Sequence, residues 1–191
     1  MSGARKLRKA AVALSIATCV LAAIFTAAFP ARGADAGSKP KVRAITAFVR
    51  LDRAHYQEQI QETLKFLRQA KAAFEKSGYE VMTIRITTQP FPEYTRAMTD
   101  EQVLAFFRDY DALAVKEGFD AAIGPAMMSD ADNPHEAELL AKIIANSKTL
   151  EGSVFIASED GIHWKSIHAA AGVIKYLEAN TPHSQIGRAH V

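Results

Sequence analysis

The chain has 191 residues, of which 49% are hydrophobic and 23% charged, with a formal charge of +2. These fractions are typical of a globular protein and exclude a disordered, collagen-like or coiled-coil chain. Five of the 23 Lys and Arg residues lie within residues 1–36, so residues 37–191 carry a net charge of −2. Proteins that bind DNA or RNA carry an excess of basic residues, and residues 37–191 have none. Nucleic acid is therefore not expected as a partner.

The first 36 residues have the pattern of a secretory signal. A basic segment, Arg5–Lys9, precedes an uncharged apolar run, Ala10–Phe29, and Ala34-Asp35-Ala36 then offers a small-x-small cleavage site. Residues 1–36 are therefore predicted to be a signal peptide, with export to the periplasm or the extracellular space. The alternative is an uncleaved membrane anchor, because residues 10–29 are just long enough to span a bilayer. The globular part is exported in either case.

The last seven residues, 185–191, resemble the product of a sequencing adapter. Ile186–Val191 is the peptide that one reading frame of a common sequencing adapter encodes, and the preceding adapter bases also fit Gln185. We therefore expect residues 185–191 to be an adapter-derived artefact and residues 37–184 to be a truncated domain whose natural chain continues. The alternative is a natural C-terminal tail.

Strand-like and helix-like segments alternate between the two ends. Runs rich in β-branched and apolar residues predict strands, and apolar residues three and four apart predict helices. Gln89–Met98 contains two prolines and is expected to be a loop, as is Pro125–Asp132. The predicted strands are Lys41–Leu51, Glu80–Thr88, Phe119–Gly124 and Ser153–Ser158, and the predicted helices run from Asp52 to Lys76, from Thr99 to Gly118, from Asn133 past Ile144 and from Trp164 to near Asn180.

The resulting order, βαβαβαβα, predicts an α/β fold. Strands that are joined through helices run parallel, with right-handed crossovers that pack the helices on the sheet. Capping signals support the helix starts: Asp52 precedes the first helix, Thr99-Asp100-Glu101-Gln102 has the capping-box pattern, and Asn133-Pro134 precedes the third helix. One domain is expected.

Several segments together resemble a known family. They are KVRAIT from Lys41, GYEVMTIRITTQPFPEY over 78–94, GFDAAIGPA over 118–126 and SVFIASEDGIHWKSIHAAAGVIKYLEANTP over 153–182. These segments resemble domain of unknown function 711, also called uncharacterised protein family 0210. The resemblance implies an α/β barrel related to the pyruvate-formate-lyase and ribonucleotide-reductase superfamily, in chains more than twice this length. It implies no reaction, because the family is uncharacterised.

Candidate ligand-binding residues lie where the predicted strands end, because ligands of parallel α/β sheets bind at the carboxyl ends of the strands. The residues at this edge are Arg50, Thr87, Thr88, Gly124, Ser158 and Asp160. The two threonines could equally mark a change from strand to loop, and Gly124 could be a simple turn residue.

Arg85 is a separate candidate because it lies between Ile84 and Ile86 on an otherwise apolar strand. An unpaired guanidinium would be costly there. A bound carboxylate or phosphate would explain this arginine. A structural ion pair or an exposed strand face would explain it as well.

No metal site is expected from the spacing of the polar residues. His163 and His168 are five residues apart, which does not place two ligands on one helix face, and Asp130-Ala131-Asp132 lacks the rest of a calcium loop. His55 and His135 lie at predicted helix starts and are expected to be solvated. No cofactor can be named from these residues.

Two function classes remain open at this stage. One is an exported enzyme acting on a small polar or anionic molecule, and the other is a non-catalytic ligand-binding or scaffold protein on the same barrel. The expected partner is a small polar or anionic ligand, with membrane contact only through residues 10–29 if they are not cleaved. A homo-oligomer is compatible with the sequence.

Overall fold

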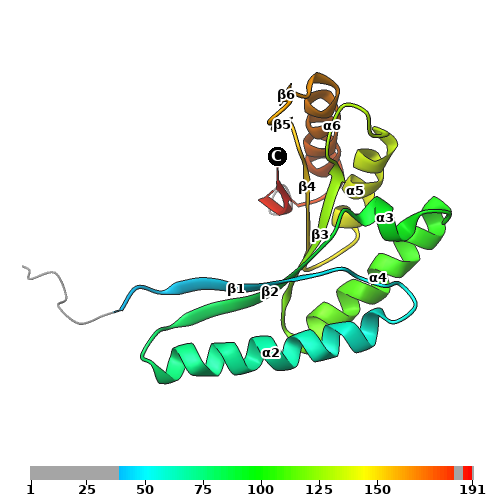
Figure 1. The fold of residues 1–191 in the computed structure, drawn as a ribbon. Coiled ribbons are helices and arrows are strands. Elements are labelled where there is room, and N and C mark those ends of the chain that lie inside the picture. Colours follow the sequence, from blue (N-terminus) through cyan, green and yellow to red (C-terminus); the bar gives the residue numbers. More distant parts are fainter. Residues whose placement is uncertain (1–38, 183–186, 191) are drawn as a thin grey trace, which may run out of the picture. The chain divides into compact units, whose positions relative to one another are not determined.

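The computed structural model describes residues 39–182 and 187–190, which belong, apart from Lys39, to one compact unit, Pro40–Val191. A five-stranded sheet has the order β1-β2-β3-β4-β7, and each neighbouring pair is parallel (Figure 1). Its strands are β1 (Val42–Val49), β2 (Val81–Thr88), β3 (Asp120–Met127), β4 (Leu150–Val154) and β7 (Ala189–His190). The helices are α2 (Tyr56–Lys76), α3 (Phe91–Thr95), α4 (Asp100–Glu117), α5 (His135–Ala145) and α6 (Trp164–Asn180).

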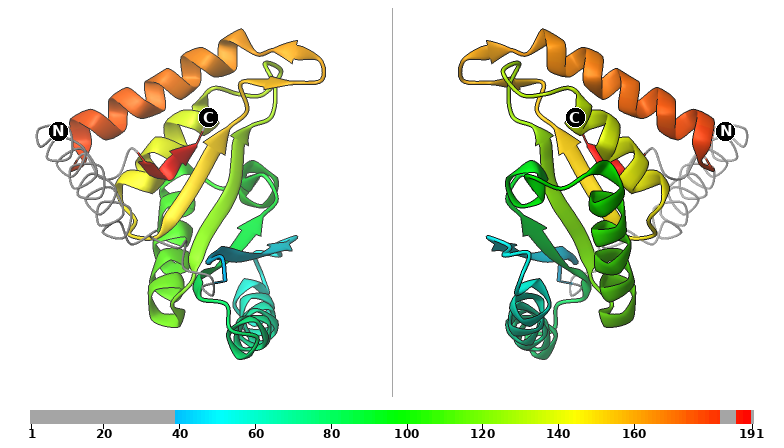
Figure 2. Two further views of the ribbon diagram at one scale, coloured as in Figure 1. Left: turned by 90° about the vertical axis from the view of Figure 1, so that its left-hand side faces the viewer. Right: turned by 90° about the vertical axis from the view of Figure 1, so that its right-hand side faces the viewer.

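The predicted α/β fold is confirmed. The order of the strands also determines on which side of the sheet the helices lie. Each of the first four strands pairs with its neighbour in sequence, so every right-handed crossover places its helix on the same side of the sheet. Accordingly α2 packs on β1 and β2, α4 on β3, and α5 on β3 and β4, while α6 packs mainly on α5 (Figure 2). Among residues 39–182 and 187–190, helices cover one face of the sheet and none covers the opposite face, which we call the open face.

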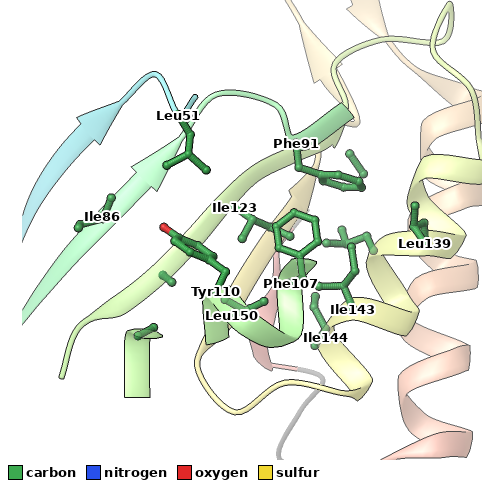
Figure 3. Packing of buried hydrophobic residues seen from close by; sticks show 14 of the residues in the cluster. Leu51, Ile86, Phe91, Phe107, Tyr110, Ile123, Leu139, Ile143, Ile144 and Leu150 are labelled. Carbon is green, nitrogen blue, oxygen red and sulfur yellow. The ribbon is translucent and has the colours of Figure 1, made fainter. Parts of the chain in front are cut away.

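The core lies between the sheet and these helices. Alternate strand residues point into it, among them Ile86, Ile123 and Leu150, each fully buried (Figure 3). Aromatic rings fill the space under α4, where Phe91 and Phe107 meet edge-to-face with ring centroids 5.7 Å apart. The residues between these positions along the strands face the open side.

The caps predicted for α4 are confirmed, whereas the N-cap of α2 is His55 instead of Asp52 and that of α5 is Pro134 instead of Asn133. Thr99 and Gln102 form both hydrogen bonds of the capping box, and Gly118 ends α4 in the left-handed conformation. Helix α2 begins at Tyr56 instead of Asp52, but the Asp52 carboxylate still accepts a hydrogen bond from the Ala54 amide at 2.8 Å. The local signals therefore fix the helix starts to within a few residues.

The loop predicted over Gln89–Met98 is wrong, because α3 lies inside it. Proline is tolerated in the first helical turn, where its missing N–H is not needed, and Pro92 occupies that turn. Phe91 and Tyr94 are buried against α4, and this packing stabilises a single turn that local propensity does not predict.

The ends of the third and fourth predicted strands are also wrong. Strand β3 continues to Met127 through an irregular pairing at Pro125, so part of the loop expected over Pro125–Asp132 is strand. Strand β4 is Leu150–Val154 rather than Ser153–Ser158. The residues after it form a short hairpin, β5 (Ala157–Ser158) and β6 (Gly161–Ile162).

A buried carboxylate secures the start of β4. Asp111 of α4 accepts hydrogen bonds from the amides of Lys148 and Thr149 at 2.9 and 2.8 Å and from the Thr149 hydroxyl at 2.8 Å. Three donors satisfy a carboxylate that would otherwise be costly to bury. Asp111 therefore ties the loop before β4 to α4.

Gly124 allows the end of β2 to approach β3 closely. Its φ is +75°, and a Cβ at this position would lie 2.1 Å from the backbone oxygen of Gln89. Gly124 is not a turn residue, because it lies within β3, and it also lines the hollow described in the next subsection.

Substituting Gly124→Ala should therefore destabilise the protein by about 2 kcal/mol or more, because backbone must move and a left-handed conformation is strained for alanine. Gly172→Ala on α6 is the matched control, since no atom lies within 4 Å of the place that its methyl group would occupy, and it should be neutral or slightly stabilising. Urea unfolding midpoints measure both effects. Equal midpoints for the two variants would contradict the close approach.

Candidate functional site

The open face of the sheet carries polar side chains from β2 and β4. Strand alternation turns Arg85 and Thr87 of β2 and Glu151 and Ser153 of β4 away from the helices. Together with the small side chain of Ala122 on β3 they line a hollow of about 460 Å³. We refer to it as the open-face hollow.

Apolar side chains form the walls of this hollow. Phe48 of β1 is 83% exposed and Phe155, which follows β4, is 40% exposed. Pro125 and Met128 complete the apolar lining. An exposed aromatic pair beside polar groups is typical of a ligand site, in which a few polar groups orient a mostly apolar molecule.

Arg85 forms ion pairs across the face of the sheet. Its Nη2 atom lies 3.4 Å from the Glu151 carboxylate and 3.7 Å from Asp120, which also accepts a hydrogen bond from the Thr83 hydroxyl at 3.0 Å. The buried Nε atom of Arg85 has no hydrogen-bond partner in the described part of the chain. The structure thus shows the ion pair that the sequence left open, and the pair lies on the floor of the hollow.

Of the two candidate threonines, Thr87 turns its hydroxyl to the hollow and Thr88 does not. Thr88 is buried, donates to the Gln89 carbonyl at 3.0 Å and lies 3.1 Å from the hydroxyl of Tyr94, so it has a structural role. The hydroxyls of Thr87 and Ser153 form no hydrogen bond with any residue in 39–182 or 187–190. These two hydroxyls are available to a ligand.

Arg50 lies outside the open-face hollow. Its side chain is 81% exposed, and it pairs with Glu93 at 3.0 Å beside a second hollow of about 530 Å³ that Arg53 and Arg96 also line. Two carboxylates, Asp52 and Glu93, lie among these arginines.

Ser158 and Asp160 lie on the hairpin that follows β4. His163 at the start of α6 is buried, and its Nε2 lies 2.8 Å from Asp160, whose carboxylate also accepts from the Ser158 hydroxyl. Serine and aspartate approach the same ring nitrogen, whereas Nδ1 faces the carbonyl of Phe155 at 3.4 Å. A hydrolytic triad needs them on opposite nitrogens, so this cluster closes the hairpin instead.

His135 is not simply solvated, as the sequence suggested. Its Nε2 lies 2.9 Å from the Asp100 carboxylate, and this pair joins the start of α5 to the start of α4. The hydrogen bond raises the pKa of His135 and lowers that of Asp100. Within the described ranges no group of His, Cys, Asp and Glu is arranged to hold a metal ion.

The sequence missed the hollow residues Phe48, Ala122, Glu151 and Ser153. Glu151 was overlooked because the fourth strand was placed three residues too late. The alternation of buried and exposed positions along β1, β3 and β4 identifies these residues, but only once the strand pairing is known.

A family model described as "Uncharacterised ACR (DUF711)" matches residues 36–191. The chain belongs to this family. The resemblance of the sequence segments to domain of unknown function 711 is thereby confirmed. No curated protein is significantly similar to this DUF711 chain.

The membrane prediction falls on residues 10–29, which lie outside the described residues. Among those that are described, no helix combines the length and the hydropathy that crossing a bilayer requires.

The hairpin cluster predicts a pH-dependent stability. The Asp160 hydrogen bond raises the pKa of His163, and Ser158 and then His163 lower the pKa of Asp160. The contribution of the pair should be largest between about pH 4 and pH 6.5, where the unfolded chain also holds both charges. It should fall as the pH rises through the folded pKa of His163, and again as the pH falls through that of Asp160.

Asp160→Asn tests this expectation. The variant should lower the pKa of His163, as measured by NMR titration of the imidazole. Its melting temperature should fall below that of the original chain most between about pH 4 and pH 6.5, and the difference should shrink as the pH rises through the folded pKa of His163. An unchanged imidazole titration would show that Asp160 does not hold His163.

Proposed function

We propose that the protein binds a small polar organic molecule in the open-face hollow. One observation carries the proposal: Arg85, Glu151 and the hydroxyls of Thr87 and Ser153 lie together between two exposed phenylalanines, on the face of the sheet that no described helix covers. Charged and polar groups that converge in an apolar-walled hollow are the usual elements of a ligand site.

We further propose that this sheet is one wall of an α/β barrel, with the open face turned to its interior. The sequential order of parallel strands with α2, α4 and α5 on one face supports this arrangement, because a doubly wound sheet needs a reversal of strand order to cover both faces. The resemblance to the pyruvate-formate-lyase-like superfamily favours the same architecture. The hollow would then lie near the carboxyl ends of the barrel strands, where ligands bind.

Binding is better supported than a particular reaction. The enzyme hypothesis depended on Arg85 as a free charge and on polar residues at the ends of the strands. Arg85 is paired with two carboxylates, and Arg50, Ser158 and Asp160 lie outside the hollow. No pair of described residues in the hollow has the geometry of a nucleophile with its base. Ligand binding without an assigned reaction is therefore the function we put forward.

A variant that fills the hollow tests the binding proposal. Ala122→Phe places a ring on the open face, away from the core, and should abolish the thermal stabilisation that a small-molecule screen finds for the original protein. Ala73→Phe, on the exposed side of α2, is the matched control and should keep it. Ligands that stabilise all three proteins equally would show that the hollow is not the site.

We also propose that the protein is exported. The basic segment, the apolar run and the Ala34-Asp35-Ala36 sequence support this, and the family match begins beside the proposed cleavage site, at residue 36.

Intact-mass measurement of the exported protein should give a chain that begins at Gly37. Signal peptidases cleave poorly where proline adjoins the scissile bond. The variant Ala36→Pro should therefore shift the mass of the protein to that of the uncleaved form. A protein that keeps residues 1–36 without any variant would instead be anchored through residues 10–29.

A further inference from the structure

We infer that the second hollow, at the carboxyl ends of β1 and β2, binds a phosphate group, either free or carried by an organic molecule. Because Arg50, Arg53 and Arg96 line this hollow, we refer to it as the arginine hollow. It is separate from the open-face hollow, so the inference goes beyond the ligand binding proposed there.

The three arginines reach the arginine hollow from two loops at one edge of the sheet. Arg50 directly follows β1, Arg53 lies in the turn before α2, and Arg96 directly follows α3. Ligands of parallel α/β proteins bind at this edge, beyond the carboxyl ends of the strands. Donors that approach from several directions suit the tetrahedral oxygens of phosphate, and the planar guanidinium of arginine binds such oxygens in pairs.

The two carboxylates in the arginine hollow already have partners. Glu93 pairs with Arg50 at 3.0 Å. Asp52 accepts a hydrogen bond from the Ala54 amide at 2.8 Å and lies 3.2 Å from Nδ1 of His55. These two contacts are the main reason that the pKa of Asp52 lies below its usual value. The carboxylates are therefore not the principal partners of the other two arginines.

Arg53 and Arg96 keep most of their N–H donors available. Arg53 donates one long hydrogen bond, of 3.4 Å, to the Tyr94 carbonyl and attracts Asp52 only weakly, without an ion pair between them. Arg96 forms no hydrogen bond or ion pair with any residue in 39–182 or 187–190. With three arginines and two carboxylates, the lining is positive, although residues 37–191 together carry −2. This local excess of the opposite sign favours an anionic ligand.

The loops that carry the arginines are fixed relative to each other. The Gln89 side chain hydrogen-bonds to both the amide and the carbonyl of Leu51, at 2.8 and 3.0 Å, and so joins the end of β2 to the residue after Arg50. The hydrogen bond from Arg53 to Tyr94 joins the same two loops again. Donors that are held in place before the ligand arrives lose less conformational entropy when it binds.

The backbone beside Arg96 is strained. Ala97 has a φ of +66°, and within the described ranges it is the only residue other than glycine with a positive φ. This left-handed conformation is costly for alanine, and such strain is concentrated at ligand sites. The strain therefore favours a functional role for the segment that carries Arg96.

Calorimetric titration of the full chain with inorganic phosphate, at pH 7.5 and constant ionic strength, tests the inference. Arg53→Gln and Arg96→Gln should each weaken phosphate binding at least fivefold, because each removes charge-assisted hydrogen bonds. Arg108→Gln, at an exposed position of α4 outside the hollow, removes the same charge and should change the affinity less than twofold. No phosphate binding by the original chain, or an equal loss in all three variants, would overturn the inference.

Glu93→Gln should have the opposite effect and tighten phosphate binding at least threefold, because it removes a negative charge and frees Arg50. An unchanged affinity in this variant would contradict the proposed site. Ala122→Phe, which fills the open-face hollow, should leave phosphate binding unchanged. Loss of phosphate binding in Ala122→Phe would place the anion in that other hollow and overturn the inference.

Two further probes identify the source of the phosphate group. Tighter binding of phenyl phosphate than of inorganic phosphate would support a ligand with an organic body, and weaker binding would support free phosphate. Malonate, which carries two planar carboxylates, should bind at least fivefold more weakly than inorganic phosphate. Equal affinity for malonate and phosphate would overturn the assignment of the ligand.

Discussion

The approach of the Gln89 backbone to Gly124 determines the arrangement of the described fold at the carboxyl ends of three strands. The bare α-carbon of Gly124 admits the Gln89 carbonyl, and the Gln89 side chain then hydrogen-bonds to both the amide and the carbonyl of Leu51 at 2.8 and 3.0 Å. The Tyr94 hydroxyl, from the turn that follows, donates to the Ile123 carbonyl at 3.2 Å. The ends of β1, β2 and β3 are therefore joined by one residue, which fixes where Thr87 and the hollow begin.

The placement of the helices on one side of the sheet explains why its other face can present charges. With α2, α4 and α5 all on the other side, the core needs only alternate residues from each strand, and the remaining positions are released from the demands of packing. Those positions hold Arg85, Glu151 and two hydroxyls instead of valine or isoleucine. One side of the sheet thus forms the core with the helices, and the other side carries the candidate site.

Features that depend on contacts within one helical turn could be predicted from the sequence. Features that depend on contacts between residues far apart in the chain could not. Thr99 with Gln102 and the glycine at 118 act within one turn, and the structure has both caps where the pattern placed them. The single turn of α3 depends on Phe91 packing against α4, and β4 depends on a glycine that leaves room for the Leu140 side chain, so neither has a local signal. Arg85 was correctly singled out as a residue needing an explanation, but its partner Glu151 is 66 residues away.

The sequential order of the strands bears on how this protein acquires its structure. Strands β1 to β4 pair in the order in which they are made, and each pairing closes over a crossover of one or two helices. Asp111 adds a contact of the same range, between α4 and the segment that precedes β4. Parallel pairing across such crossovers is of longer range than the contacts within a helix bundle and slows folding, but the βα units can still be added one after another in the order of synthesis.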